Sequence, residues 1–280
     1  FSFFYYRPSG SPLRSLRPLR YLPSRLSRSG RVRNVLSRAA ARFLGYTGYF
    51  QLYQVPFRHL DVLAYSETRD LYTKGGINSG AHTFLDTFRE RNIPFHVSDW
   101  RRPEEHNLAR LKEEIGQGEI KFAYLYLAHM DGVLHHHGTG SDRVADKLDW
   151  YDRELRKLLQ TARENYSEVE LHLFSDHGMT DVKETCNLSK LVESTGLEFG
   201  RDYVAVYDST MARFWFMSTR SRRVITQTLN REKRGRWLSD EQLGEWGCRF
   251  PDSFYGEAFF LMRPSIRRGP RFMGVKPVSW

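Results

Sequence analysis

Residues 120–128 read IKFAYLYLA and residues 169–174 read VELHLF, and these two apolar runs decide the fold. Each predicts a β-strand, and the near-continuous first run predicts a strand that is covered on both faces. Between them, residues 141–164 carry apolar side chains at a 3.6-residue period, which predicts a long helix with Ser141 as its N-cap. A strand, a helix and a second strand in this order predict a right-handed parallel crossover.

The rest of the chain extends this pattern. The spacing of apolar residues predicts further helices at residues 80–91, 104–115 and 220–229, and further strands at residues 94–98, 203–207, 211–217 and 257–262. Alternating strands and helices are typical of an α/β fold. We therefore expect a three-layer α/β/α sandwich with a mostly parallel sheet.

The positive charge of the chain is concentrated in one segment. Residues 1–60 hold eleven Arg and no Lys, Asp or Glu, so the remaining residues hold 32 Lys and Arg against 33 Asp and Glu. Arginine favours bidentate contacts to phosphate. We predict that residues 1–60 form an Arg-rich insertion or lid, with short helices broken by Pro18 and Pro23, and that residues 61–280 form a single α/β core. A solvated basic insertion, or a surface that binds nucleic acid or anionic lipid, are the alternatives.

Composition excludes several classes of protein. No run of apolar residues approaches the 18 needed for a membrane-spanning helix. The chain has two cysteines, Cys186 and Cys248, which exclude a disulfide framework and a cysteine-based zinc site. Low cysteine usage favours a reducing compartment, and so a cytoplasmic location.

Two clusters of potential metal ligands follow the two deciding strands. Asp131 and His135 come after the first strand and are four residues apart, and Asp176 and His177 follow the second strand directly. Because the carboxyl ends of parallel strands meet at one edge of a sheet, we expect the two clusters to be neighbours in space. Carboxylate and imidazole are a ligand set for Zn²⁺ or Mn²⁺. A helical turn after the first strand places Asp131 and His135 on one side.

Other polar residues near these clusters are candidates for supporting roles. Ser175 is expected to orient a carboxylate, and Gly178 to supply the tight backbone of the second turn. His136 and His137 are expected to be pocket walls or solvated side chains. Arg213 follows a predicted tight turn and is expected either to be structural or to line the pocket.

At these residues the sequence resembles the alkaline phosphatase superfamily, in its type I phosphodiesterase/nucleotide pyrophosphatase branch. Residues 131–138 resemble its D-x-x-x-H-x-x-G element, and residues 175–179 its S-D-H-G-M element. The resemblance implies an alkaline phosphatase-like core and a hydrolase of small-molecule phosphate esters with two divalent metal ions, Zn²⁺ or Mn²⁺. It implies that Asp131 and His135 hold one ion and that Asp176 and His177 hold the other.

The resemblance leaves three alternative functions open, and three residues of the family's site have no match in this chain. A sulfatase or a phosphomonoesterase of the same superfamily, or a non-catalytic protein that binds anions or nucleic acid, are the alternatives. The resemblance implies three further site residues: an Asp, a Ser or Thr nucleophile, and a His near the C-terminus. None of them matches a residue of this chain. We therefore expect a fragment that lacks both ends and is inactive alone, with its nucleophile upstream of Phe1. Candidates for a nucleophile inside the chain, by residue type only, are Thr47, Ser79, Thr83 and Thr210.

Overall fold

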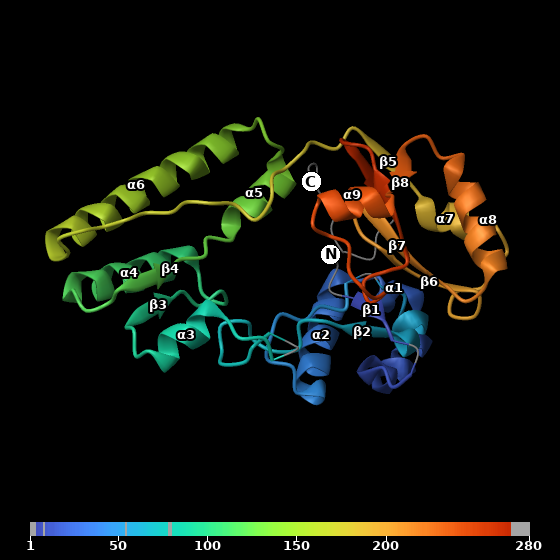
Figure 1. The fold of residues 1–280 in the computed structure, drawn as a ribbon, viewed down its shortest axis with the longest axis horizontal. Helices are drawn as coiled ribbons and strands as arrows, with labels where there is room; N and C mark the ends of the chain where they lie inside the picture. Colours follow the sequence, from blue (N-terminus) through green and yellow to red (C-terminus); the bar gives the residue numbers. More distant parts are fainter. Residues whose placement is uncertain (1–3, 8, 54, 78–79, 270–280) are drawn as a thin grey trace. The chain divides into compact units, whose positions relative to one another are not determined.

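The computed structural model describes residues 4–7, 9–53, 55–77 and 80–269. The chain divides into two compact units, which are described separately below (Figure 1). Of the described residues, unit 1 combines those up to Leu71 with those from Val182 to Gly269, and unit 2 consists of Tyr72–Asp181. Both candidate ligand clusters belong to unit 2.

Unit 2 contains one parallel crossover of strand, helix and strand, but among the described residues the predicted crossover from residues 120–128 to 169–174 is not formed. Its elements are α3 (Phe84–Glu90), β3 (Phe95–Val97), α4 (Glu104–Gln117), β4 (Phe122–Tyr124), α5 (His129–His137) and α6 (Asp142–Asn165). β3 and β4 pair in parallel, with α4 as the connection, as the sequence predicts. Leucines of α4 and α6 pack together in the core of this unit, because both helices carry an apolar stripe at helical spacing.

The edges of the unit 2 helices follow local signals. The predicted helix at 80–91 begins only at residue 84, because Thr83 and Asp86 form a capping box there. α4 ends where Gly118 adopts a φ of 71°, which glycine tolerates best. The long helix α6 is confirmed with Ser141 in the N-cap position, although Ser141 makes no side-chain capping bond.

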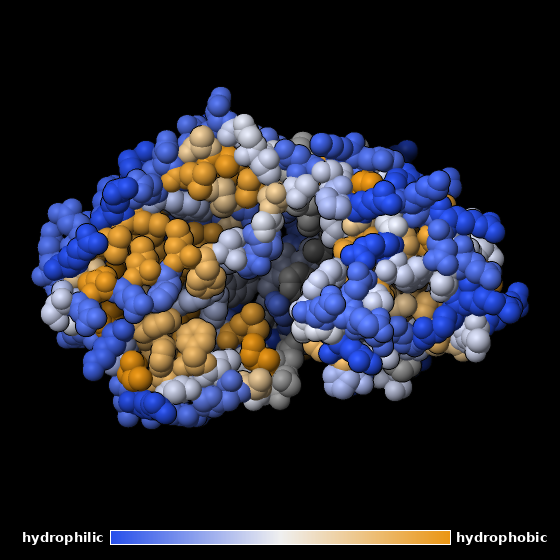
Figure 2. All heavy atoms as spheres, turned by 45° about the horizontal axis from the view of Figure 1, so that its top comes forward, coloured by the Kyte–Doolittle hydropathy of each residue, from blue (hydrophilic) through white to orange (hydrophobic). Residues whose placement is uncertain are grey.

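The prediction of a strand at residues 169–174 is wrong for the described structure. These residues form no ladder with another strand, and Leu173 and Phe174 are 78% and 72% exposed. The first deciding run is also shortened, to Phe122–Tyr124. Strand preference depends on a paired, half-buried neighbour, which an apolar run cannot supply by itself. Apolar side chains consequently gather on the surface of this unit (Figure 2).

Unit 1 is built on an antiparallel sheet of four strands in the order β6-β7-β9-β8. These are β6 (Tyr203–Tyr207), β7 (Met211–Phe216), β8 (Gly235–Trp237) and β9 (Ala258–Met262). The predicted turn between the first two is confirmed, since the Asp208 amide donates to the Met211 carbonyl at 2.8 Å. A second, parallel pair joins β5 (Glu184–Cys186) to β10 (Ile266–Arg268). The α/β class is as expected, but the largest sheet among the described residues is antiparallel.

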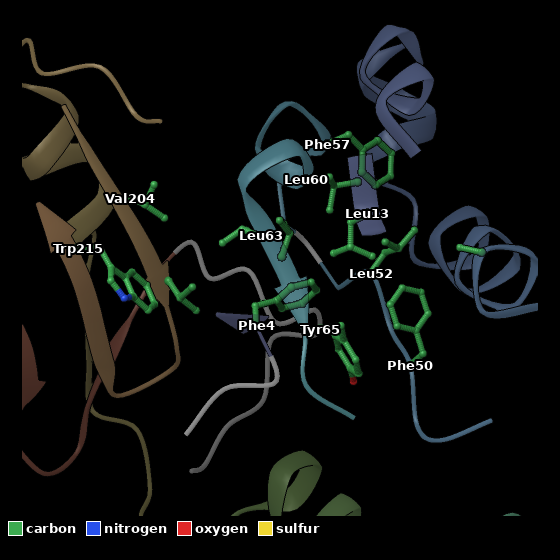
Figure 3. Close-up of a cluster of buried hydrophobic side chains, with 13 residues drawn as sticks. Phe4, Leu13, Phe50, Leu52, Phe57, Leu60, Leu63, Tyr65, Val204 and Trp215 are labelled. Carbon is green, nitrogen blue, oxygen red and sulfur yellow. The ribbon is translucent and has the colours of Figure 1, made fainter. Parts of the chain in front are cut away.

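Both faces of β6 and β7 are covered. Val204, Val206 and Trp215 face one core (Figure 3), whereas Ala205 and Phe214 face another. Successive side chains of a strand point to opposite faces, so two cores need a continuous apolar run. The helices α7 (Leu188–Glu193) and α8 (Thr219–Asn230) pack against each other beside the sheet, and α9 (Asp240–Glu245) follows β8.

Residues from the Arg-rich segment supply most of the first core. The segment folds into β1 (Phe4–Tyr6), η1 (Pro12–Tyr21), α1 (Ser24–Ser27), α2 (Gly30–Leu44) and the start of η2 (Phe57–Val62). The strand after it, β2 (Leu63–Tyr65), pairs antiparallel with β1. Pro23 separates η1 from α1 as predicted. Pro18 lies inside η1 and, contrary to the prediction, does not break it. The lid role of residues 1–60 stays a prediction.

One arginine of this segment is structural. Arg33 of α2 is buried and donates to the carbonyl oxygens of Tyr53 and, at 3.1 Å, Val55. Burial lowers the pKa of this guanidinium to about 10. Its contacts satisfy carbonyls of the loop after α2, so Arg33 stabilises the core of unit 1.

His59 is a buried, neutral histidine in unit 1, and it should make stability depend on pH. Its ring stacks on Phe199 with centroids 3.7 Å apart, and burial, with Arg58, lowers its pKa to about 3. Between pH 6.5 and 3 the unfolded chain binds a proton that the folded chain does not, so stability falls as pH falls. We expect the free energy of unfolding to drop by about 2 kcal/mol between pH 7 and pH 5 from this group.

Urea unfolding at both pH values measures this effect. His59→Phe keeps an aromatic ring against Phe199 and should remove this part of the pH dependence. His82→Gln, which changes an exposed histidine, is the control and should leave the profile as it is in the wild type. Parallel profiles for wild type and His59→Phe would show that the imidazole titrates normally.

Candidate metal centre

Asp131 and His135 are presented by α5, the short helix that starts five residues after β4. The prediction that the chain coils at this point is confirmed, and the two side chains meet across one helical turn. His135 Nε2 lies 3.3 Å from Asp131 Oδ1. The His135 side chain is mostly buried, at 17% exposed, whereas that of Asp131 is half exposed.

Asp176 and His177 lie in the loop that follows the exposed run 169–174. The His177 amide donates to Asp176 Oδ1 at 3.1 Å, and His177 Nε2 lies 3.7 Å from Asp176 Oδ2. His177 Nδ1 is 2.9 Å from the Gly178 carbonyl oxygen, which can only accept. A hydrogen bond at this position needs the proton on Nδ1, which leaves Nε2 as the ring atom available to a metal ion.

The two clusters meet at Asp131. Its Oδ1 lies 3.3 Å from His135 Nε2 and 4.0 Å from His177 Nε2. The prediction that residues about forty positions apart are neighbours is thus confirmed. Asp181 connects the same two segments, since its carboxylate accepts from both the amide and the hydroxyl of Thr139 at 2.9 Å.

Of the two ligand pairs, only Asp131 and His135 have the spacing of two ligands of one divalent metal ion. Nitrogen and oxygen ligands of a tetrahedral Zn²⁺ stand about 3.3 Å apart, given bond lengths of about 2.0–2.2 Å. The Asp131–His135 separation matches this value, and the wider distances at His177 do not. Among the described residues, no three or more His, Cys, Asp or Glu side chains form a complete ligand set. The chain thus supplies ligand pairs that need further ligands.

The supporting candidates have other contacts. Ser175 Oγ donates to the His177 carbonyl at 2.6 Å, so it closes the turn; the expected bond from Ser175 to a carboxylate is not seen among the described contacts. His136 Nδ1 is 2.7 Å from the Gly132 carbonyl, and His136 and His137 are exposed. Gly178 has free space where a Cβ would lie and no positive φ, so the turn does not require glycine.

For Arg213, Thr83 and Thr47 the structure shows contacts outside the candidate metal centre. Arg213 belongs to β7 of unit 1, where it is fully buried and donates to the carbonyls of Phe4 and Tyr255. Thr83 caps α3 and Thr47 accepts from the Asp70 amide. Thr210 is in the β6–β7 turn, and Ser79 lies outside the described residues.

Two residues near the site were not singled out from sequence. Burial raises the pKa of Tyr126, and the nearby charges of Asp176 and Asp131 raise it further, so this phenol stays protonated beside both clusters. Glu104 at the start of α4 contacts the first residue of α5. No local pattern marks Glu104, because its partners are 25 to 47 positions away.

A cavity of about 1300 Å³ lies in unit 1 and contains none of the four candidate ligands. The side chains that line this cavity include the basic and aromatic residues Arg58, His59, Lys190, Phe199 and Tyr203. Asp176 and His177 are instead at an open surface, with side chains 74% and 57% exposed. Among the described residues, no helix combines the length and apolar character needed to cross a membrane.

The model of the type I phosphodiesterase / nucleotide pyrophosphatase family matches residues 50–242, which include all four candidate ligands. The chain belongs to this family. The predicted resemblance to this family is confirmed by this match, which extends over more than half of the chain.

Solved structures agree with an alkaline phosphatase-like fold. Human ectonucleotide pyrophosphatase / phosphodiesterase 5 matches with a TM-score of 0.58 and 15% identity over 74% of this chain. The murine protein of the same name matches with a TM-score of 0.59 and 14% identity over 79% of this chain, both alone and as an inactive variant in complex with AMP. This phosphodiesterase-family chain spans 60% of the human and 64% of the murine chain. The expected fold class is thereby confirmed.

Proposed function

We propose that the protein hydrolyses phosphodiester or pyrophosphate bonds of small organic phosphates with two divalent metal ions, Zn²⁺ or Mn²⁺. Asp131 and His135 hold one ion, and Asp176 and His177 hold the other. The observation that carries this assignment is the meeting of both ligand pairs at Asp131, whose Oδ1 faces His135 and His177. Membership of the phosphodiesterase family supports the reaction class.

The residues of the site have distinct tasks in this reaction. When bound, the divalent ions stabilise the negative charge that develops on the phosphate and lower the pKa of the attacking oxygen. Asp131 and Asp176 supply the negative charge that attracts the ions, and His177 is oriented by the Gly178 carbonyl to present Nε2. Thr139 and Asp181 hold the two ligand-bearing segments together.

A nucleotide-like substrate fits this assignment. The murine relative was solved in complex with AMP, which combines a phosphate with an aromatic base. Tyr126, a protonated phenol beside Asp131 and Asp176, can donate to a phosphate oxygen near the ions. We therefore include phosphodiesters and pyrophosphates of nucleosides in the substrate class.

Removal of one ligand tests the proposal. Asp176→Ala in the full protein should lower the metal content from about two ions to about one per chain, as measured by elemental analysis. It should also abolish hydrolysis of a bis-aryl phosphodiester, because one ion cannot stabilise both the attacking and the leaving oxygen. Asp149→Ala, which changes an exposed carboxylate of α6, is the control. Unchanged metal content and activity in Asp176→Ala would refute the assignment of this ligand.

A further inference from the structure

Glu104 is a buried carboxylate that joins three helices of unit 2. It is the first residue of α4, and its side chain is 3% exposed. Its Oε1 accepts from the backbone amide of His129 at 2.8 Å and from the Tyr151 hydroxyl at 2.7 Å. Its Oε2 accepts from Lys147 Nζ at 2.6 Å. The partners come from the start of α5 and from α6.

Such a carboxylate is stable inside a protein only when it is fully partnered. Lys147 balances the charge, and the two remaining donors fill the other oxygen. Burial and the bond to Glu104 raise the pKa of Tyr151, so this phenol keeps its proton and remains a donor. The partners of Glu104 are therefore well matched, and the carboxylate has a fixed orientation.

The bond to His129 replaces a missing helix cap. The first amides of a helix have no partner within the helix. In α5 the N-cap position is Ala128, whose side chain makes no capping bond. Glu104, 25 residues earlier in the chain, accepts from the His129 amide instead. The bond to Glu104 thus satisfies an amide at the start of α5 that has no partner within the helix.

The start of α5 sets the direction of Asp131. Asp131 lies two residues after His129, in the first turn of α5. If the first turn of α5 unwinds, Asp131 leaves the helical conformation that places it on the same face as His135. Its carboxylate is then no longer held 4.0 Å from His177 Nε2.

We propose that Glu104 is a positioning residue for the metal centre: its Oε1 fixes the first turn of α5 and so holds Asp131 in place for the ions. This inference rests on the proposed function of the Asp131–His135 pair. Glu104 does not itself bind the ions or the substrate. Its effect on them passes through the backbone of α5.

The two oxygens of Glu104 have different partners, so two double variants can be compared: one keeps an oxygen for His129 and Tyr151, and the other lacks it. The double variant Glu104→Gln with Lys147→Met removes the buried charge pair but keeps an oxygen for His129 and Tyr151. The double variant Glu104→Met with Lys147→Met has nearly the same volume and lacks that oxygen. Replacing a buried ion pair by apolar side chains of similar size is often neutral for stability, so both proteins should fold.

Two measurements compare the two proteins. The first is Zn²⁺ affinity, by competition with a chromophoric chelator, and the second is amide hydrogen exchange of residues 129–134. We expect the Gln/Met protein to bind Zn²⁺ within about 3-fold of wild type, and the Met/Met protein to bind it about 10-fold or more weakly. The His129 amide should exchange faster only in the Met/Met protein. A purely structural role would affect the melting temperature and leave Zn²⁺ affinity equal in both.

The outcomes separate this inference from the proposed function. Equal Zn²⁺ affinity of the two double variants, or equal exchange at His129, would overturn the positioning role. A wild-type protein that binds no Zn²⁺ or Mn²⁺ would overturn the proposed function, and the assignment of Glu104 with it. If only the Met/Met protein binds Zn²⁺ weakly, the result supports both the positioning role of Glu104 and the proposed function.

Discussion

Asp131→Asn is expected to lower kcat/KM for a bis-aryl phosphodiester by about 10³-fold or more. Asp131 is the residue at which both ligand pairs meet, with Oδ1 3.3 Å from His135 Nε2 and 4.0 Å from His177 Nε2. Asparagine keeps the size of the side chain but removes the negative charge that attracts the ions. A loss of this size is about 4 kcal/mol in transition-state stabilisation, which is within the range of metal-ion catalysis.

Steady-state kinetics at saturating Zn²⁺ and elemental analysis measure the two parts of this effect. Asp146→Asn, which neutralises another exposed carboxylate of unit 2, is the matched control and should change kcat/KM less than about 2-fold. If Asp131→Asn kept wild-type metal content and activity, the site assignment would be wrong. If it kept both ions but lost activity, Asp131 would act on the substrate and not as a ligand.

Arg213→Ala should destabilise unit 1 by about 3–5 kcal/mol. Arg213 is fully buried in β7 and donates to the carbonyl of Phe4 at 2.6 Å and to that of Tyr255 at 2.7 Å. Its Nε lies 3.6 Å from Asp208 Oδ2. The variant would leave these carbonyls without their donor and Asp208 without the opposite charge, which is more costly than losing contacts alone.

Urea unfolding followed by tryptophan fluorescence measures this loss, because Trp215 lies in the same strand. Arg223→Ala, at an exposed position of α8, removes the same charge and should change stability by less than about 0.5 kcal/mol. A loss below about 1.5 kcal/mol in Arg213→Ala would show that water replaces the guanidinium.

Much of the site could be predicted because its signals are local. The i, i+4 spacing of Asp131 and His135 needs only one helical turn, and α5 supplies it. The expectation that this pair meets His177 rested on two parallel strands that end at the same edge of a sheet. The residues do meet, although residues 169–174 form no strand in the described structure, so the stated reason for the meeting does not hold. The role of Arg213 could not be chosen from sequence, because burial inside a sheet leaves no local pattern.

Strand formation at residues 169–174 was the main failure. The run VELHLF has strand character, but its Leu173 and Phe174 are exposed and it pairs with no other strand among the described residues. A ladder needs donors and acceptors from a second segment, and composition does not report whether one is present. The shortening of the run 120–128 to β4 has the same cause.

The sequence by itself determined the family, the α/β class and the four candidate ligands, because motif spacing and helical periodicity are properties of neighbouring residues. Only the tertiary structure decided what positions those ligands. Asp131 faces two imidazoles, the His177 ring is oriented by a carbonyl, and Glu104 caps a helix that begins 25 residues later. These contacts arise when helices pack and buried charges must find partners, and that requirement acts through space.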